Sequence, residues 1–211
     1  MARQDRAERT RNAILDAAAA VFDERGFNGA SLSDILAKAG VTKGALYFHF
    51  SSKEELARAI VEEQFTVDLP FVDFDNPGLQ TLIDMSHALA HNLLTNVRVR
   101  AGARLVIEAN FADPTPDPYL RWIDSAHTVL VAAQERGDLR KEWDPKDVAN
   151  WMSAVFMGVQ TQSDVLTGRA DVHDRLTRLW QIALPGLVPP RRLPRFVPSG
   201  TTNWDTSAAT A

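Results

Sequence analysis

Apolar residues recur every three or four positions along most of this chain, which is the spacing of residues on one face of an α-helix. No segment alternates apolar and polar residues as a half-buried strand would, so the pattern predicts an all-α fold. Capping residues, glycines and prolines mark where the expected helices begin and end. These helices are expected over residues 6–25, as a pair of short helices within 31–50, and over 52–66, 78–96, 98–111, 119–136, 145–167 and 172–187.

The segment 31–50, SLSDILAKAGVTKGALYFHF, has the pattern of two short helices joined by a tight turn. Ser31 or Ser33 is a suitable N-cap for the first helix. Gly40 permits the left-handed backbone that ends a helix, and Thr42 is a suitable cap for the second. This pattern is typical of a helix-turn-helix that binds DNA.

The second helix of this pair has one apolar and one polar face. Leu46 and Phe50 are expected to point inward, and Gly44 costs about 1 kcal/mol relative to Ala inside a helix. Close approach to a phosphate chain would explain that glycine. The alternative to DNA binding by segment 31–50 is an ordinary helical hairpin packed in a core. The outer face or helix entrance, and so the candidate DNA contacts, comprises Thr42, Lys43, Gly44, Tyr47 and His49.

Two residues flank this helix pair as candidate phosphate contacts. Ser31 stands at the start of the first helix, and Lys53 stands at the start of the helix that follows the pair. Ser52 and Glu55 have the three-residue spacing of a capping box at that start. Backbone N–H groups at a helix start also point toward phosphates, which favours both positions for DNA contacts.

The charge distribution agrees with DNA binding at the N-terminal end. The net charge of the chain is −4, which alone would argue against a nucleic-acid partner. Residues 1–53, however, hold eight Lys or Arg against six Asp or Glu, whereas the remainder holds 15 against 21. The N-terminal part therefore carries the attractive field for DNA.

Composition also limits the compartment and the chemistry. The chain has no cysteine, which excludes disulfides and thiol chemistry and favours a reducing cytoplasm. No stretch approaches the roughly 20 apolar residues of a membrane span, and the charged start MARQDRAERTRNA is unlike a signal peptide. We expect a cytoplasmic protein that does not contact a membrane.

Proline-rich breaks divide the chain into three expected parts. Residues 1–53 are expected to form a DNA-binding domain, and residues 54–188 a larger helical domain. A tail follows that domain. The tail, 189–211, contains four prolines and the run SGTTNWDTSAATA, and is expected to be disordered.

Residues 6–61 resemble the N-terminal domain of TetR-family repressors, and VTKGALYFHFSSKEEL is close to the strongest signature of that family. Within the family, the chain resembles the γ-butyrolactone receptors of streptomycetes and their pseudo-receptor relatives. The features that carry this narrower resemblance are the opening MARQDRAERTR, the segment RAGARL (100–105), the pair Arg121-Trp122 and the ending IALPGLVPP.

The resemblance implies a homodimer that represses transcription by binding a pseudo-palindromic operator in double-stranded DNA. Each subunit would place the second helix of the pair in a major groove, with Lys43 as the base contact and Tyr47 and Ser31 on phosphates. A small ligand bound in the C-terminal domain would shift the population of conformations and release the DNA. Antibiotic biosynthesis or differentiation genes are the expected targets.

The ligand expected from the resemblance is a mostly apolar, neutral butyrolactone or butenolide, and a pseudo-receptor would bind an antibiotic or an intermediate instead. Trp122 offers a large apolar face with one N–H donor. Gln64 and Thr161 are uncharged polar groups that match positions suited to the lactone or hydroxyl. For each of these residues an ordinary place in the core or on the surface is the alternative. Apolar wall candidates are Met85, Val106 and Phe156.

Residues 145–187 are expected to form the dimer interface. Both helices there have apolar faces, which a two-fold axis would combine into a four-helix interface. Packing only within the subunit is the alternative. The residues of these faces are Val148, Trp151, Met152, Val155, Phe156 and Val159, and Leu176, Leu179, Trp180, Ala183 and Leu187.

One constellation favours a different class of protein. Asp84, His87 and His91 share one helix face and are ligand types that hold metals. Three ligands on one rigid helix, however, span about 10 Å at a rise of 1.5 Å per residue. We expect no metal site, no cofactor and no enzymatic activity, with a helical metalloenzyme and a helical interaction protein as the alternatives.

Overall fold

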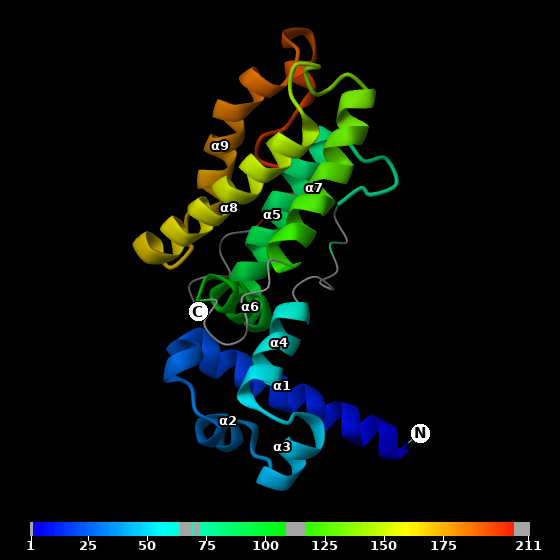
Figure 1. Cartoon of the computed structure of the whole chain (residues 1–211). Coiled ribbons are helices and arrows are strands. Elements are labelled where there is room, and N and C mark those ends of the chain that lie inside the picture. Colours follow the sequence, from blue (N-terminus) through cyan, green and yellow to red (C-terminus); the bar gives the residue numbers. More distant parts are fainter. Residues whose placement is uncertain (1, 64–68, 70–71, 109–116, 205–211) are drawn as a thin grey trace. The chain divides into compact units, whose positions relative to one another are not determined.

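The computed structural model describes residues 2–63, 69, 72–108 and 117–204, and these form helices without a strand (Figure 1). The all-α prediction is confirmed for this part of the chain. The helices are α1 (Ala2–Gly29), α2 (Leu32–Ala39), α3 (Lys43–His49), α4 (Lys53–Glu63), α5 (Leu79–Thr95), α6 (Val97–Glu108), α7 (Asp117–Glu135), α8 (Pro145–Thr167), α9 (Val172–Leu187) and the short 3₁₀ helix η2 (Pro190–Arg195). None of the helices described here is long and apolar enough to cross a membrane.

The chain folds into two compact units, and each has its own core. Unit 1 comprises residues 1–68 and 95–118, and unit 2 comprises residues 69–94 and 119–211. The core of unit 1 joins α1 to the helix pair α2 and α3 and to α4 and α6. Its fully buried side chains include Ile14, Phe22, Ile35, Leu46, Leu56, Ile60 and Leu105.

Unit 1 is larger than the expected DNA-binding domain of residues 1–53. Leu56 and Ile60 of α4 and Leu105 of α6 lie in the same core as Phe22 of α1. Because these side chains share one core with α1, α4 and α6 belong to the unit that carries the helix pair. The compact unit that carries the helix pair thus extends beyond residue 53.

Unit 2 is built from α5, α7, α8, α9 and η2 around a core that includes Ile83, Leu130 and Trp180. The Trp180 side chain is fully buried, and its indole N–H donates to Ser86 Oγ at 2.9 Å. Helices α8 and α9 lie side by side. Both have the bounds expected from the sequence.

The expected disordered tail is ordered as far as the structure describes it. Phe196 and Trp204 pack against the core of unit 2. The Thr201 backbone N–H donates to Asp84 Oδ1 at 2.7 Å, and the Val197 N–H donates to Gln80 Oε1 at 2.9 Å. Apolar burial and hydrogen bonds to α5 thus fix residues 189–204 despite their prolines, whereas 205–211 lie outside the described residues.

Candidate nucleic-acid interface and ligand residues

Helix α3 is held at both ends and along one face. Thr42 is its N-cap, with Oγ1 accepting the Ala45 N–H at 3.2 Å, and Phe50 is its C-cap. Leu46 and Phe50 are buried in the core of unit 1, as the sequence predicts. The opposite face is consequently fixed in direction, which a surface that binds DNA requires.

The exposed face of α3 begins with Lys43 and Gly44. The Lys43 ammonium lies 5.7 Å from the centroid of the Tyr47 ring, and both side chains are exposed. A Cβ added at Gly44 would meet no atom within 4 Å, so packing within the subunit does not require a glycine there. The open space over Gly44 agrees with close approach by an external partner.

Phe48 is a further exposed residue on this face, and the sequence interpretation overlooked it. Its side chain is 77% exposed and packs edge to face against His49, with ring centroids 4.9 Å apart. His49 itself is half-buried. The spacing of Gly44, Tyr47 and Phe48 is i, i+3, i+4, so helical periodicity contained the signal that these three residues share a face.

Ser31 is the N-cap of α2. Its Oγ accepts the Asp34 N–H at 3.1 Å, and its backbone N–H donates to Asp34 Oδ2 at 3.3 Å, which completes a capping box. The hydrogen bond from Ser31, together with the charge of Arg25, holds the pKa of Asp34 below its usual value. The cap orients the exposed start of α2, and a phosphate contact by Ser31 stays a prediction.

Lys53 has a different environment from the one expected. Its ammonium donates to the carbonyl oxygens of Phe27 at 2.8 Å and Ala30 at 2.9 Å, and lies 4.2 Å from the centroid of the Phe27 ring. These contacts hold the ammonium inside unit 1, where it is part-buried. These contacts give Lys53 a structural role at the end of α1, and its phosphate contact stays a prediction.

The ligand candidates do not share one environment. Gln64 lies outside the described residues. Val106 packs against the core of unit 1, whereas Met85 is buried in the core of unit 2. Phe156 packs on a small cluster formed by Ala90, Val172 and Leu176.

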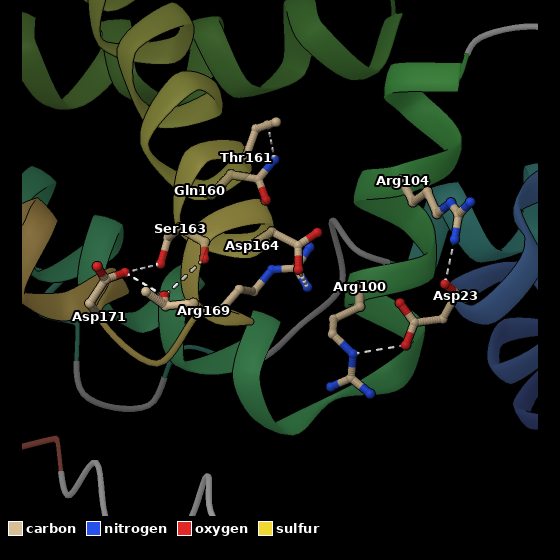
Figure 2. A network of polar contacts seen from close by, with 10 residues as sticks. Asp23, Arg100, Arg104, Gln160, Thr161, Ser163, Asp164, Arg169 and Asp171 are labelled. Atoms are coloured by element: carbon tan, nitrogen blue, oxygen red, sulfur yellow. Dashed lines mark hydrogen bonds and ion pairs between the residues drawn. The ribbon is translucent and has the colours of Figure 1, made fainter.

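Two ligand candidates are accessible to different degrees. Trp122, on α7, is half-buried. Thr161, on α8, is exposed, and its hydroxyl accepts a hydrogen bond from the amide of the buried Gln160 at 3.0 Å (Figure 2). Gln160 Oε1 is buried without a hydrogen-bond partner among the described residues, which makes Gln160 a polar group that the sequence interpretation overlooked.

The side chains of Asp84 and His87 are occupied by protein partners. Asp84 accepts hydrogen bonds from Thr201, and His87 Nε2 lies 3.0 Å from the Pro198 carbonyl oxygen. His91 lies against the Trp204 ring at 4.6 Å between centroids. Among the described residues no group of three or more His, Asp or Glu is arranged to hold a metal ion.

Comparison with known proteins identifies the family. Residues 14–60 match the model of the bacterial regulatory proteins of the tetR family, and residues 76–189 match the model of a tetracyclin repressor-like C-terminal domain. The A-factor receptor protein of Streptomyces griseus is 42% identical over 95% of this chain and 71% of its own.

Two solved structures are similar over most of their length. One, described as a gamma-butyrolactone receptor (ArpA-like protein), has a TM-score of 0.76 at 35% identity and covers 92% of this chain and 96% of its own. The other, CprB from Streptomyces coelicolor in complex with its operator sequence, has a TM-score of 0.72 at 35% identity over 90% and 94% of the two chains. The chain belongs to the TetR family, is related to the γ-butyrolactone receptors, and is a DNA-binding transcriptional repressor and not an enzyme.

Proposed function

We propose that this repressor binds a pseudo-palindromic operator as a homodimer and leaves it when each subunit binds a neutral, largely apolar γ-butyrolactone or butenolide. The observation that carries the DNA part is the face of α3. That face presents a lysine, an unshielded glycine backbone and two aromatic rings, while Leu46 and Phe50 anchor the other side.

The proposed DNA contacts are of two kinds, a contact to a base edge and contacts to phosphates. Lys43 is proposed to contact a guanine edge, because lysine and arginine are best suited to the two acceptors there. Tyr47 and Ser31 are proposed to bind phosphates and so to position the helix. Thr42, Gly44 and His49 complete the contacts proposed for α3 and its cap, and we add Phe48 because its ring is exposed on the same face.

A second copy of the chain is proposed to cover α8 and α9. Several of the apolar side chains expected at the interface, including Trp180 and Met152, are buried within the subunit instead. Others, including Val155 and Leu179, line a groove of about 490 Å³ on these two helices. Trp151 and Ile182, which also line the groove, are 44% and 81% exposed, and burying such side chains against a symmetry mate would favour a dimer.

The proposed ligand class follows the relatives. The A-factor receptor and the γ-butyrolactone receptor structure are similar to this chain through both units. Trp122 is proposed as an apolar wall of the ligand site, with Gln64 and Thr161 as polar contacts and Met85, Val106 and Phe156 as further walls. Antibiotic biosynthesis or differentiation genes are the proposed targets of repression.

The test is binding of the purified full chain to fragments of its own upstream region across a salt series, with and without a solvent extract of the host culture. Saturable protection of two half-sites about one helical turn apart, or a multiple of that spacing, would support the dimer. Loss of that protection on adding extract would support the ligand. Specific binding that no extract changes would favour a pseudo-receptor, and weak binding without sequence preference would contradict the proposal.

A further inference from the structure

The joint between α1 and the DNA-binding helix pair is a break in the helix at Gly26. Gly26 has φ 69° and ψ 178°, so the backbone leaves the helical conformation there before α1 ends at Gly29. Residues 26–30 then lead directly to Ser31, the N-cap of α2. Because this joint is the covalent connection from α1 to α2, its conformation contributes to the direction of α2 and α3 relative to α1.

A break in a helix leaves backbone groups without helical partners. Helix α6 supplies partners for backbone groups before and after the break at Gly26. On the near side, Arg104 Nη1 donates to the Asp23 carbonyl oxygen at 2.6 Å. On the far side, the Phe27 N–H donates to Glu108 Oε2 at 2.7 Å. Arg104 Nε and Glu108 Oε1 are themselves paired at 2.7 Å, so one ion pair on α6 contacts both sides of the joint.

Arg100 extends this contact along α1. Its Nε lies 2.9 Å from Asp23 Oδ2, and Figure 2 shows Arg100 and Arg104 directed from α6 toward Asp23. Arg100, Arg104 and Glu108 are spaced by four residues and therefore follow one face of α6. The two arginines belong to the RAGARL segment, which marks the resemblance to the receptors but has no role in the DNA-binding or ligand residues derived above.

The backbone of the joint favours glycine at position 26. Its positive φ of 69° strains any residue that has a side chain. A Cβ there would lie 2.4 Å from Glu108 Oε1 and 2.9 Å from Arg104 Nη2, so the ends of these two side chains would have to shift. A side chain at position 26 would therefore disturb the contacts of α6 as well as the backbone.

Helix α4 holds the other half of the joint. Lys53, its first residue, donates to the carbonyl oxygens of Phe27 and Ala30. The joint is thus bound by an acidic side chain from α6 at its start and a basic side chain from α4 along its length. Both helices connect in sequence to unit 2. The chain enters unit 2 at residue 69, after α4, and α6 is preceded by α5 and followed by α7.

We propose that Arg104 and Glu108 of α6 are positioning residues that hold the Gly26–Ala30 joint in the conformation that presents α3 to DNA. A change in unit 2 that draws α6 from the joint would remove the partners of Asp23 and Phe27 and free α2 and α3 to reorient. This inference rests on the proposed function for its link to operator release, but the holding of the joint is a property of unit 1 alone.

The experiment uses the full chain in four forms: wild type, Glu108→Ala, the exchanged pair Arg104→Glu/Glu108→Arg, and Asp16→Asn. The exchanged pair keeps an ion pair at the same spacing on α6 but offers no acceptor to Phe27 and no donor to Asp23. Asp16→Asn is the matched control, because Asp16 pairs with Arg98 of α6 at 2.7 Å, away from the joint. Operator affinity, Tm and hydrogen exchange by mass spectrometry are measured on each form.

Glu108→Ala and the exchanged pair are expected to weaken operator binding by about tenfold or more, the effect of losing a hydrogen bond to a charged group. Both are expected to speed amide exchange severalfold over residues 27–36 and to leave residues 145–187 unchanged. Asp16→Asn should stay within about twofold of wild type in operator affinity, since salt bridges with an exposed partner contribute little.

Recovery of wild-type affinity and exchange by the exchanged pair would overturn the inference, because it would mean that the ion pair only stabilises α6. Equal behaviour of Glu108→Ala and Asp16→Asn would overturn it too. If wild type itself binds no operator specifically, the proposed function fails, and exchange over residues 27–36 in the same four forms still decides whether α6 holds the joint.

Discussion

The Nδ1 atoms of His87 and His173 lie 3.0 Å apart in unit 2, and their rings are parallel within 2°. His173 is 8% exposed, and its Nε2 is buried without a hydrogen-bond partner among the described residues. Burial, with the charges of His87 and His91, lowers the pKa of His173 to about 4. Burial also lowers the pKa of His87, although the Pro198 carbonyl and Asp84 oppose that shift.

The histidine pair predicts that folding stability falls in mild acid. Because both pKa values are lower in the folded chain than the unfolded value of about 6.5, the unfolded chain binds more protons as the pH falls. The stabilisation is complete above about pH 6.5 and is lost toward pH 4, by on the order of 3 kcal/mol for His173 alone. Thermal unfolding between pH 7 and pH 5 measures this loss as a decrease in Tm of several degrees.

A substitution separates this effect from general acid sensitivity. His173→Gln should flatten the dependence of Tm on pH over that interval, because it removes one of the two titrating rings. His127→Gln, at a half-buried histidine of α7, is the matched control and should keep the wild-type slope. An unchanged slope in His173→Gln would show that other groups cause the acid sensitivity.

Lys43→Ala is expected to weaken operator binding by about tenfold, since a good contact to a base edge is worth about 1–3 kcal/mol. Fluorescence anisotropy with a labelled operator measures the change, and the specificity for the half-site should relax. Lys38→Ala, which removes an exposed lysine in the last turn of α2, is the control for charge and should change affinity less. Equal losses in both variants would indicate a contribution from net charge alone.

Phe48→Ala is expected to weaken operator binding without changing Tm by more than about 1 °C. The side chain is 77% exposed, so its removal opens no cavity in unit 1, but it deletes an aromatic surface beside Tyr47. Phe22→Ala, at a fully buried ring of the same unit, should instead lower Tm sharply. Wild-type affinity in Phe48→Ala would remove this ring from the proposed contacts.

Ile182→Glu is expected to convert the proposed dimer to a folded monomer. Ile182 is 81% exposed in the subunit and lines the groove on α8 and α9, so a charge there costs little in the monomer but much in an apolar interface. Sedimentation velocity measures the oligomeric state, and Val197→Glu, at an exposed residue beyond η2, is the control. A dimer that survives Ile182→Glu would exclude this face as the interface.

The sequence was sufficient to predict helix bounds and orientation where capping residues and helical periodicity agree. The bounds of α8 and α9 match the expected ranges because Asp144 and Gly168 cap α8 and both helices have continuous apolar faces. The orientation of α3 likewise follows from the spacing of Leu46 and Phe50. These features depend on residues a few positions apart, which a pattern along the chain contains.

Features that depend on distant residues could not be predicted in the same way. Lys53 was expected to bind phosphate, but its partners are carbonyls more than 20 residues earlier in the chain, brought close by the packing of α4 on α1. Thr201 and Asp84 are 117 residues apart, so no local pattern indicated that they form a hydrogen bond. Without that contact, the prolines of the C-terminal segment were taken as a sign of disorder. The first helix was expected over residues 6–25, and nothing local indicated that Glu108 would bind the backbone beyond its end.

The proposed function requires that a lactone releases this repressor from its operator. The most direct measurement is the anisotropy of a preformed complex between the full chain and its labelled operator as a synthetic acyl γ-butyrolactone is added, with Trp122→Ala in parallel. The wild-type complex is expected to dissociate in a saturable manner, whereas the Trp122→Ala complex is expected to form normally and to resist the lactone. A wild-type complex that persists at saturating lactone, or a Trp122→Ala complex that dissociates as readily as wild type, would contradict the proposed release by a lactone.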